Sequence, residues 1–153
     1  MTISTLHPPD SQTPISMRFQ GGVGAPLRAR RSVLSELAGQ LGPRRAEDAA
    51  LIVSELVTNS VVHANVGSGK TLTVELMRLD DRVRITVIDP GSQLQPRIRA
   101  TDHKTPGGFG LIIVDELSSA WGVVRGGGST SVWCELALDP SAPDPRDRGR
   151  HPS

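Results

Sequence analysis

Three polar residues that could do chemistry lie along one apolar stretch of the sequence. The stretch ALIVSELVTNSVVHA contains Glu55, Asn59 and His63, each four residues after the last. At about 100° per residue, this spacing places Glu55 and Asn59 one turn apart on a helix, with His63 somewhat further round. A helix this apolar is expected to be largely buried, where a carboxylate or an amide is costly unless it is paired or binds a ligand.

Two interpretations of this helix remain open. In the first, the polar stripe lines a pocket, where Glu55 accepts a proton and the carbonyl oxygen of Asn59 ligates a hard cation such as Mg²⁺. In the second, Glu55 pairs with a basic neighbour such as Arg30, Asn59 bonds to the backbone, and His63 is a helix cap or a core residue.

Two further signals lie downstream of this helix. The run Ile88-Asp89-Pro90-Gly91 places a carboxylate at the end of an apolar strand, with Gly91 leaving room for a ligand, although Asp-x-Gly is also an ordinary turn. The run Gly107-Gly108-Phe109-Gly110-Leu111 opens a short apolar segment. If that segment is a helix, its free backbone N–H groups could bind an anion.

Residues 64–71, ANVGSGKT, come close to the Gly-x-x-x-x-Gly-Lys-Ser/Thr loop that binds phosphate. That loop follows a strand and opens a helix, whereas here a helix ends near Ala64 and a strand begins near Leu72. Ala64 also replaces the first glycine. We therefore expect a helix-to-strand turn, and no Gly-x-Gly-x-x-Gly run after a strand supports a dinucleotide fold.

The elements that must position these residues follow from the periodicity of apolar side chains. Helical spacing predicts helices over 25–41, 44–64 and 110–117, and alternation predicts strands over 15–19, 72–79, 83–88, 121–124 and 131–138. Residues 90–107 show no periodicity, and so long a stretch inside a small domain is usually functional. The predicted fold class is α+β, a two-layer sandwich with helices covering one face of a mostly antiparallel sheet.

Length and composition limit the alternatives. With 153 residues, 37% of them hydrophobic, and a formal net charge of +1, the chain fits one folded domain without a global basic field for nucleic acid. Prolines concentrate near both ends, so we expect disordered tails over 1–14 and 140–153 around a domain of 15–139. One cysteine and the lack of a signal-like or membrane-spanning apolar run indicate a cytoplasmic protein that makes no membrane contact.

Taken together, Glu55-x-x-x-Asn59, Asp89-x-Gly91 and Gly108-x-Gly110-Leu111 resemble the N, G1 and G2 boxes of the gyrase, heat-shock-chaperone and histidine-kinase ATPase superfamily, the Bergerat fold. The strings ELVTNSVVHA, VIDPG, GGFGLIIVDELSSAWGV and SVWCEL look most like its small single-domain branch, the anti-sigma-factor serine/threonine kinases. The resemblance covers about residues 15–138.

The resemblance implies a site for ATP and Mg²⁺. Asp89 would accept a hydrogen bond from the adenine amine, Asn59 would ligate Mg²⁺, and Glu55 would take the proton from a serine or threonine hydroxyl. Residues 92–107 would form a lid. The remaining nucleotide contacts would come from His63, Gly91, Thr105, Gly107, Gly108, Gly110, Leu111 and either Thr130 or Ser131.

The resemblance also implies a homodimer, joined through the first strand and helix, that sequesters a sigma factor and phosphorylates an anti-anti-sigma antagonist. Two departures favour an alternative, a nucleotide-gated binding module without phosphoryl transfer. The last strand begins Ser129-Thr130-Ser131-Val132-Trp133 where the branch often has Gly-Lys-Thr-Val-Trp, and Phe109 replaces a residue that is often polar. Charge in this region could instead come from Arg97, Arg99 and Lys104.

Overall fold

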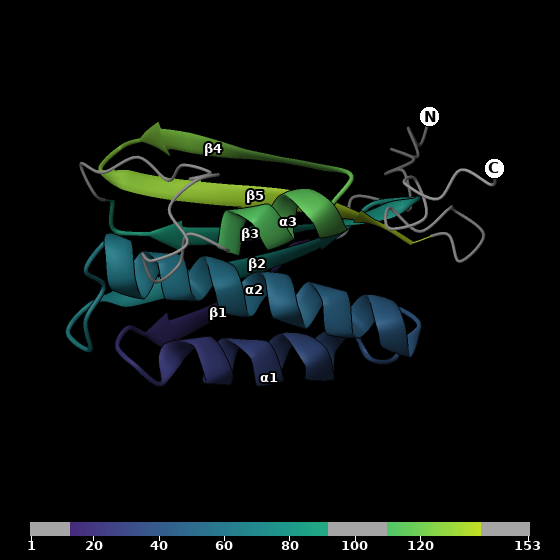
Figure 1. Ribbon diagram of the computed structural model, residues 1–153, viewed down its shortest axis with the longest axis horizontal. Helices are drawn as coiled ribbons and strands as arrows, with labels where there is room; N and C mark the ends of the chain where they lie inside the picture. Colours follow the sequence, from purple (N-terminus) through teal and green to yellow (C-terminus); the bar gives the residue numbers. More distant parts are fainter. Residues whose placement is uncertain (1–12, 92–109, 139–153) are drawn as a thin grey trace, which may run out of the picture.

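The computed structural model describes residues 13–91 and 110–138. Within them the elements run in the order β1 (Ile15–Gln20), α1 (Ala25–Leu37), α2 (Pro43–His63), β2 (Thr71–Arg78), β3 (Arg82–Asp89), α3 (Gly110–Leu117), β4 (Ala120–Gly126) and β5 (Ser129–Ala137). The strands form one sheet in the order β1-β2-β3-β5-β4, and every neighbouring pair is antiparallel. The helices cover one face of this sheet (Figure 1), so the predicted α+β sandwich is confirmed.

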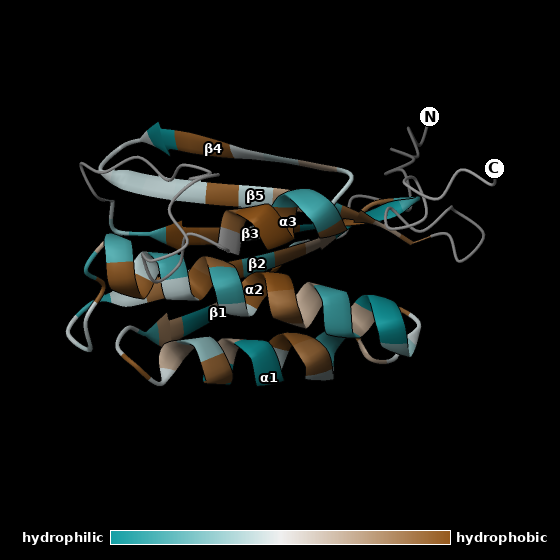
Figure 2. Cartoon of the chain, in the orientation of Figure 1, coloured by the Kyte–Doolittle hydropathy of each residue, from teal (hydrophilic) through white to brown (hydrophobic). Residues whose placement is uncertain are grey.

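Strand alternation decides which residues enter the core. Every second residue of β2 and β3 is buried beneath the helices, including Leu72, Val74, Val83 and Ile85. The central helix α2 buries Ile52, Val53, Leu56 and Val57 in the same core, and the middle of α2 and much of α3 are strongly hydrophobic (Figure 2). The core is therefore built mainly from aliphatic residues, as the scarcity of aromatic residues requires.

In the parts of the chain that the structure describes, no helix combines the length and the apolar character that crossing a bilayer requires.

The opposite face of the sheet carries polar and aromatic side chains. The guanidinium of Arg84 lies 4.5 Å from the centre of the Trp133 ring and donates to Glu135 Oε1 at 3.0 Å. Arg82 also pairs with Glu135. This layer satisfies the Glu135 carboxylate on the face that no described helix covers.

The predicted helix over 25–41 ends too late. Helix α1 stops at Leu37, and the N–H groups of Gln40 and Leu41 both bond to the Leu37 carbonyl in a tight turn. Gly39 lies in this turn, and glycine disfavours helix continuation because it has the most backbone freedom to lose. Leu41 remains buried, which explains why its spacing fitted the helical pattern.

The turn between β1 and α1 packs tightly against the turn between α2 and β2. Gly21 N–H donates to the Lys70 carbonyl and Gly22 N–H to the Val66 carbonyl, each at 2.9 Å. A Cβ atom at Gly21 would overlap the carbonyl oxygens of Val66 and Gly67. Residues 64–70 thus form the predicted helix-to-strand turn, and the phosphate-loop interpretation is excluded.

The first prediction concerns this contact. Gly21→Ala should lower the free energy of unfolding by about 1–3 kcal/mol, because the new methyl group meets rigid backbone. Gly39→Ala is the matched control, since an added Cβ there has no neighbour within 4 Å. Urea denaturation should show a change of at most about 0.5 kcal/mol for the control. Equal effects in the two variants would contradict the packing argument.

Candidate functional site

The carboxylate of Asp89 is held from two sides. Asp89 is the last residue of β3 and is buried. Ser60 Oγ donates to its Oδ2 at 2.9 Å, and the Gly91 N–H donates to its Oδ1 at 2.8 Å. Since a carboxylate has about four lone-pair positions, these two bonds fix its plane and leave acceptor capacity for a ligand.

Ser60 is a site residue that the sequence analysis missed. It directly follows Asn59 on α2, but it belongs to the buried arc that faces the sheet. Its partner lies 29 residues away, so no local spacing connects the two. The available signal was a single hydroxyl within an otherwise apolar arc, which calls for a buried partner.

The register of the sheet distinguishes Thr130 from Ser131. Thr130 pairs directly with Asp89 across β3 and β5 and is buried, whereas Ser131 pairs with Ile88. Because paired residues point to the same face, Thr130 shares the helix-covered face with Asp89, and Ser131 faces the other side. Only Thr130 of the two is therefore beside Asp89.

Gly91 is required for a reason other than room for a ligand. Its φ is +92°, a conformation that residues with a side chain rarely adopt. An added Cβ would also lie 2.6 Å from the Gly128 carbonyl oxygen. The tip of the β4–β5 hairpin thus occupies the space that the missing side chain leaves.

The polar stripe of α2 combines an unpartnered acceptor with a perturbed carboxyl. Asn59 Oδ1 is buried and has no hydrogen-bond partner among the described residues. Glu55, one turn earlier, is half-buried, and this burial raises its pKa. Arg30 pairs with Glu47 at 3.6 Å, so the expected alternative of an Arg30–Glu55 pair is wrong. His63 is the last residue of α2 and is half-buried.

The donor set at Asn59 fits magnesium held together with phosphate. A buried amide oxygen without a partner is costly, and a hard cation would relieve that cost. Residues 13–91 and 110–138 contain no group of three His, Cys, Asp or Glu side chains placed to hold a metal. Magnesium commonly takes few protein ligands and completes its shell with water and substrate phosphates, which matches a single amide oxygen.

Helix α3 starts at Gly110, and the side chain of Leu111 is buried in the core. Leu111 can therefore offer a ligand only its backbone. The helix is tied to β4 by a hydrogen bond of 2.8 Å from Trp121 Nε1 to Asp115 Oδ1. The other residues expected here lie outside the described parts of the chain: Arg97, Arg99, Lys104, Thr105, Gly107, Gly108 and Phe109.

This two-layer sandwich, with helices on one face of an antiparallel sheet, has the architecture of the Bergerat fold. The sequence model of the histidine kinase-like ATPase domain matches residues 25–135, and the chain belongs to that family. The fold and the superfamily expected from the sequence are thus confirmed.

Two other proteins are similar to this chain. The chain is 36% identical over 67 residues to the anti-sigma F factor of Caldanaerobacter subterraneus subsp. tengcongensis, a match that covers 42% of this chain and 47% of the relative. The chain thus matches about half the length of that curated relative. The RsbU and RsbW domains of Rv1364c from Mycobacterium tuberculosis align with a TM-score of 0.63 at 22% identity, covering 84% of this chain and 34% of that one. The first match supports the resemblance to the anti-sigma-factor branch over those 67 residues, and the second supports the fold alone.

The second prediction concerns Ser60. Ser60→Ala removes the donor to Asp89 Oδ2 and should lower the free energy of unfolding by about 1–3 kcal/mol, because a buried acceptor loses its partner. Ser54→Ala, the same change on the same helix, is the control, since no hydrogen bond to the Ser54 hydroxyl is present among the described residues. Chemical denaturation should separate the two variants, and equal losses would argue against the Ser60–Asp89 bond.

The third prediction concerns Glu55. Since burial raises its pKa, the folded protein binds a proton at this carboxyl more readily than the unfolded chain does. Its contribution to stability is therefore present below the ordinary glutamate pKa and is lost as the pH rises through the raised pKa of the folded state. Glu55→Gln should flatten this part of the dependence of unfolding free energy on pH. Urea denaturation at a series of pH values measures the unfolding free energy of the wild type and of Glu55→Gln. If the two plots of unfolding free energy against pH run parallel, the prediction is contradicted.

Proposed function

We propose that this chain is an ATP-binding serine/threonine kinase of the anti-sigma-factor type. The observation that carries the proposal is the polar stripe of α2, where the unpartnered oxygen of Asn59 stands one turn from the Glu55 carboxyl with its raised pKa. The next residue, Ser60, holds Asp89. Helix α2 thus supplies three proposed roles: Asn59 as a cation ligand, Glu55 as a base, and Ser60 as the support of the carboxylate that binds adenine.

Nucleotide recognition is assigned to the end of β3. Asp89 accepts a hydrogen bond from the exocyclic amine of adenine, while Ser60 and the Gly91 amide hold the carboxylate plane. Thr130 adds a hydroxyl from the neighbouring strand. The backbone around Gly110 and Leu111 is proposed to face the phosphates. Further nucleotide contacts are proposed from the family resemblance at His63, Thr105, Gly107 and Gly108.

Glu55 is proposed to act on the protein substrate. Its carboxylate accepts the proton of a serine or threonine hydroxyl, whose oxygen bonds to the γ-phosphorus of ATP as the bond to the bridging oxygen breaks and ADP leaves. A pKa raised by burial makes Glu55 a better base than an exposed glutamate. Asn59 Oδ1 would hold magnesium, which when bound offsets the charge on the transferred phosphoryl group.

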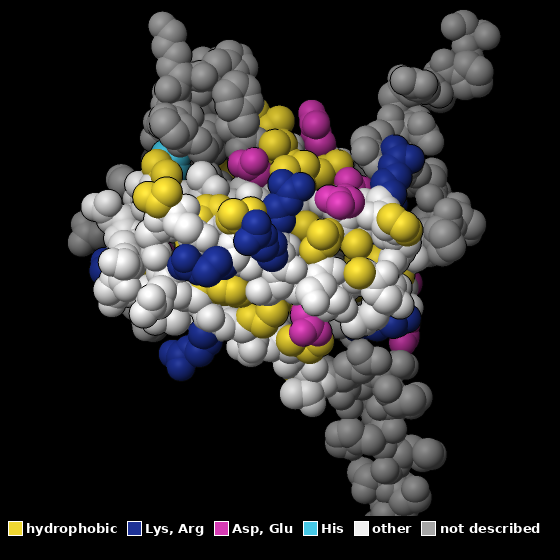
Figure 3. Space-filling view, turned by 90° about the horizontal axis from the view of Figure 1, so that it is seen from below, with side chains coloured by type: hydrophobic (Ala, Val, Ile, Leu, Met, Phe, Trp, Pro, Cys, Tyr) yellow, Lys and Arg dark blue, Asp and Glu magenta, His cyan; other side chains and the backbone are white. Residues whose placement is uncertain are grey.

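The proposed protein partners are a sigma factor, held in one state, and an anti-anti-sigma antagonist, phosphorylated in the other. The name of the relative from Caldanaerobacter, an anti-sigma F factor, supports this proposal. The face that carries α1 shows basic and acidic side chains among hydrophobic ones (Figure 3), and Val23 and Leu27 are 96% and 52% exposed. Mixed apolar and arginine-rich surfaces suit protein contacts. A homodimer through β1 and α1 is part of the proposal.

The remaining proposals concern organisation and location. We propose a catalytic domain over 15–139 with tails over 1–14 and 140–153, working in the cytoplasm without direct contact to nucleic acid. The near-zero net charge of +1 supports the last point, because nucleic-acid binding depends on a basic surface.

The fourth prediction tests phosphoryl transfer. Incubation with MgATP labelled at the γ-position and a candidate antagonist should label a serine or threonine of the antagonist. Glu55→Gln should reduce the rate by about 10²–10⁴-fold, the usual contribution of a general base. The variant should still bind MgATP, which a thermal shift measures.

Other outcomes have distinct meanings. Nucleotide binding and partner capture without any labelled product would support the binding module in place of the kinase. MgATP at a hundredfold excess over Kd should stabilise the protein by about 2.7 kcal/mol, so the lack of any thermal shift would overturn both functions.

Asn59→Ala should remove the dependence of nucleotide affinity on magnesium, and an unchanged dependence would contradict the assignment of Asn59.

A further inference from the structure

Helix α3 packs on the sandwich through one apolar face. Its residues Leu111, Val114 and Leu117 recur every three positions and are buried, and α3 lies beside α2 over the same face of the sheet (Figure 1). Hydrophobic attraction is non-directional, so this contact resists removal of the helix more than a shift along its axis. A directional bond is needed to fix where the helix begins.

The side chain of Asp115 takes part in such a bond. Trp121 Nε1 donates to Asp115 Oδ1 at 2.8 Å, which joins α3 to β4. Asp115 lies in the last turn of α3, where no basic residue is present and where the helix dipole disfavours a negative charge. The indole N–H that bonds to this carboxylate offsets that cost, so the placement of Asp115 depends on Trp121.

Trp121 is itself fixed by the sheet. It pairs with Cys134 across β4 and β5, and Cys134 is fully buried, so the Trp121 ring lies on the helix-covered face and packs against the core. Two residues earlier, the Ser119 N–H donates to the Glu135 carbonyl at 2.9 Å. The donor is therefore a rigid ring on a paired strand, and the acceptor belongs to a helix of only eight residues.

We infer that Trp121 is a positioning residue for phosphate binding. The inference rests on the proposed function, in which the backbone around Gly110 and Leu111 faces the phosphates. Asp115 lies four residues after Leu111, about 6 Å along the helix axis. Because so short a helix moves as a unit, the bond to Trp121 fixes the position of the N–H groups in its first turn, which have no partner within the helix.

The adenine-binding part of the proposed site does not depend on this bond. Asp89 is held by Ser60 and by the Gly91 N–H, and Thr130 stands beside it on β5. None of these contacts involves α3. Loss of the Trp121 donor should therefore weaken ligands that carry phosphate and spare adenosine, which carries none, whereas a general loss of stability would not distinguish the two ligands.

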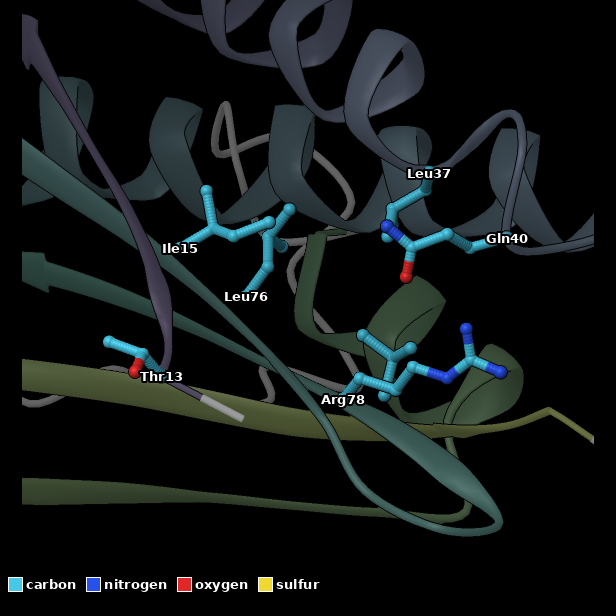
Figure 4. Close-up of a pocket in the computed structure, with 7 residues that line it drawn as sticks. Thr13, Ile15, Leu37, Gln40, Leu76 and Arg78 are labelled. Carbon is cyan, nitrogen blue, oxygen red and sulfur yellow. The ribbon is translucent and has the colours of Figure 1, made fainter. Parts of the chain in front are cut away.

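A pocket near the other edge of the sheet offers a control for loss of stability. Its apolar walls include Ile15, Leu37 and Leu76, and Figure 4 shows these side chains around a common space. They belong to β1, α1 and β2, whereas β4 forms the opposite edge of the sheet. Leu37→Val should lower the free energy of unfolding, because a buried methylene group is lost, and should leave both ligand affinities unchanged.

The fifth prediction compares MgATP with adenosine in the full chain. Trp121→Phe keeps an aromatic ring but removes the N–H donor, and it should weaken MgATP binding by about threefold to tenfold, the size of one hydrogen bond, with adenosine affinity unchanged. Isothermal titration calorimetry measures MgATP, and ligand-detected NMR measures adenosine. Trp133→Phe is the matched control, because Trp133 stacks with Arg84 on the uncovered face of the sheet, and it should leave both affinities unchanged.

Changes at Asp115 test whether it acts with Trp121 through one bond. Asp115→Ala should match Trp121→Phe, whereas Asp115→Asn keeps an acceptor oxygen and should retain most of the MgATP affinity. The double variant of Trp121→Phe and Asp115→Ala should bind MgATP no more weakly than either single variant. Losses that add in the double variant would contradict a shared bond.

Failure of the inference and failure of the proposed function give different results. If the wild type binds MgATP and Trp121→Phe binds it equally well, or if MgATP and adenosine lose affinity by the same factor, the inference is wrong and nucleotide binding stands. If the wild type binds neither ligand, the proposed nucleotide site fails and the inference fails with it. A wild type that binds MgATP without transferring phosphate, together with the selective loss in Trp121→Phe, would support the inference and count against the kinase.

Discussion

The hydrogen bond from Ser60 to Asp89 joins the central helix to the central region of the sheet and holds the candidate site together. It is a polar contact inside an otherwise aliphatic interface, where an unpaired carboxylate would be costly. The bond therefore fixes α2 relative to β3. Because Asn59 and Glu55 belong to the same rigid helix, fixing Ser60 also fixes the direction in which they point.

The two ends of the sandwich differ in what they bring together. At one end, the end of β3, the β4–β5 hairpin tip, the second half of α2 and the start of α3 meet (Figure 1). At the other end, the chain enters at Thr13 and leaves after Leu138. Thr13 and Leu138 therefore lie away from the residues that are proposed to bind nucleotide.

Much of the fold could be predicted because each strand has one buried and one open face. Alternation in β2 and β3 located each end of these strands to within one residue, and α3 was predicted with its observed bounds. The predicted end of α1 was wrong. Leu41 is buried and keeps the helical spacing of apolar residues, but it follows a turn that contains a glycine and lies beyond the end of the helix. Apolar spacing reports burial, and burial continues past the end of an element.

The amino-acid sequence alone was enough to establish which chemistry is present: Glu55 and Asn59 one turn apart, and Asp89 before Gly91 at a strand end. These are local relations, set by the periods of helix and strand. The folded chain was needed to show that Ser60 holds Asp89, that Thr130 and not Ser131 stands beside it, and that Gly91 makes room for the hairpin tip. Those relations join residues far apart in the chain, and they depend on strand register and helix packing, which no local pattern encodes.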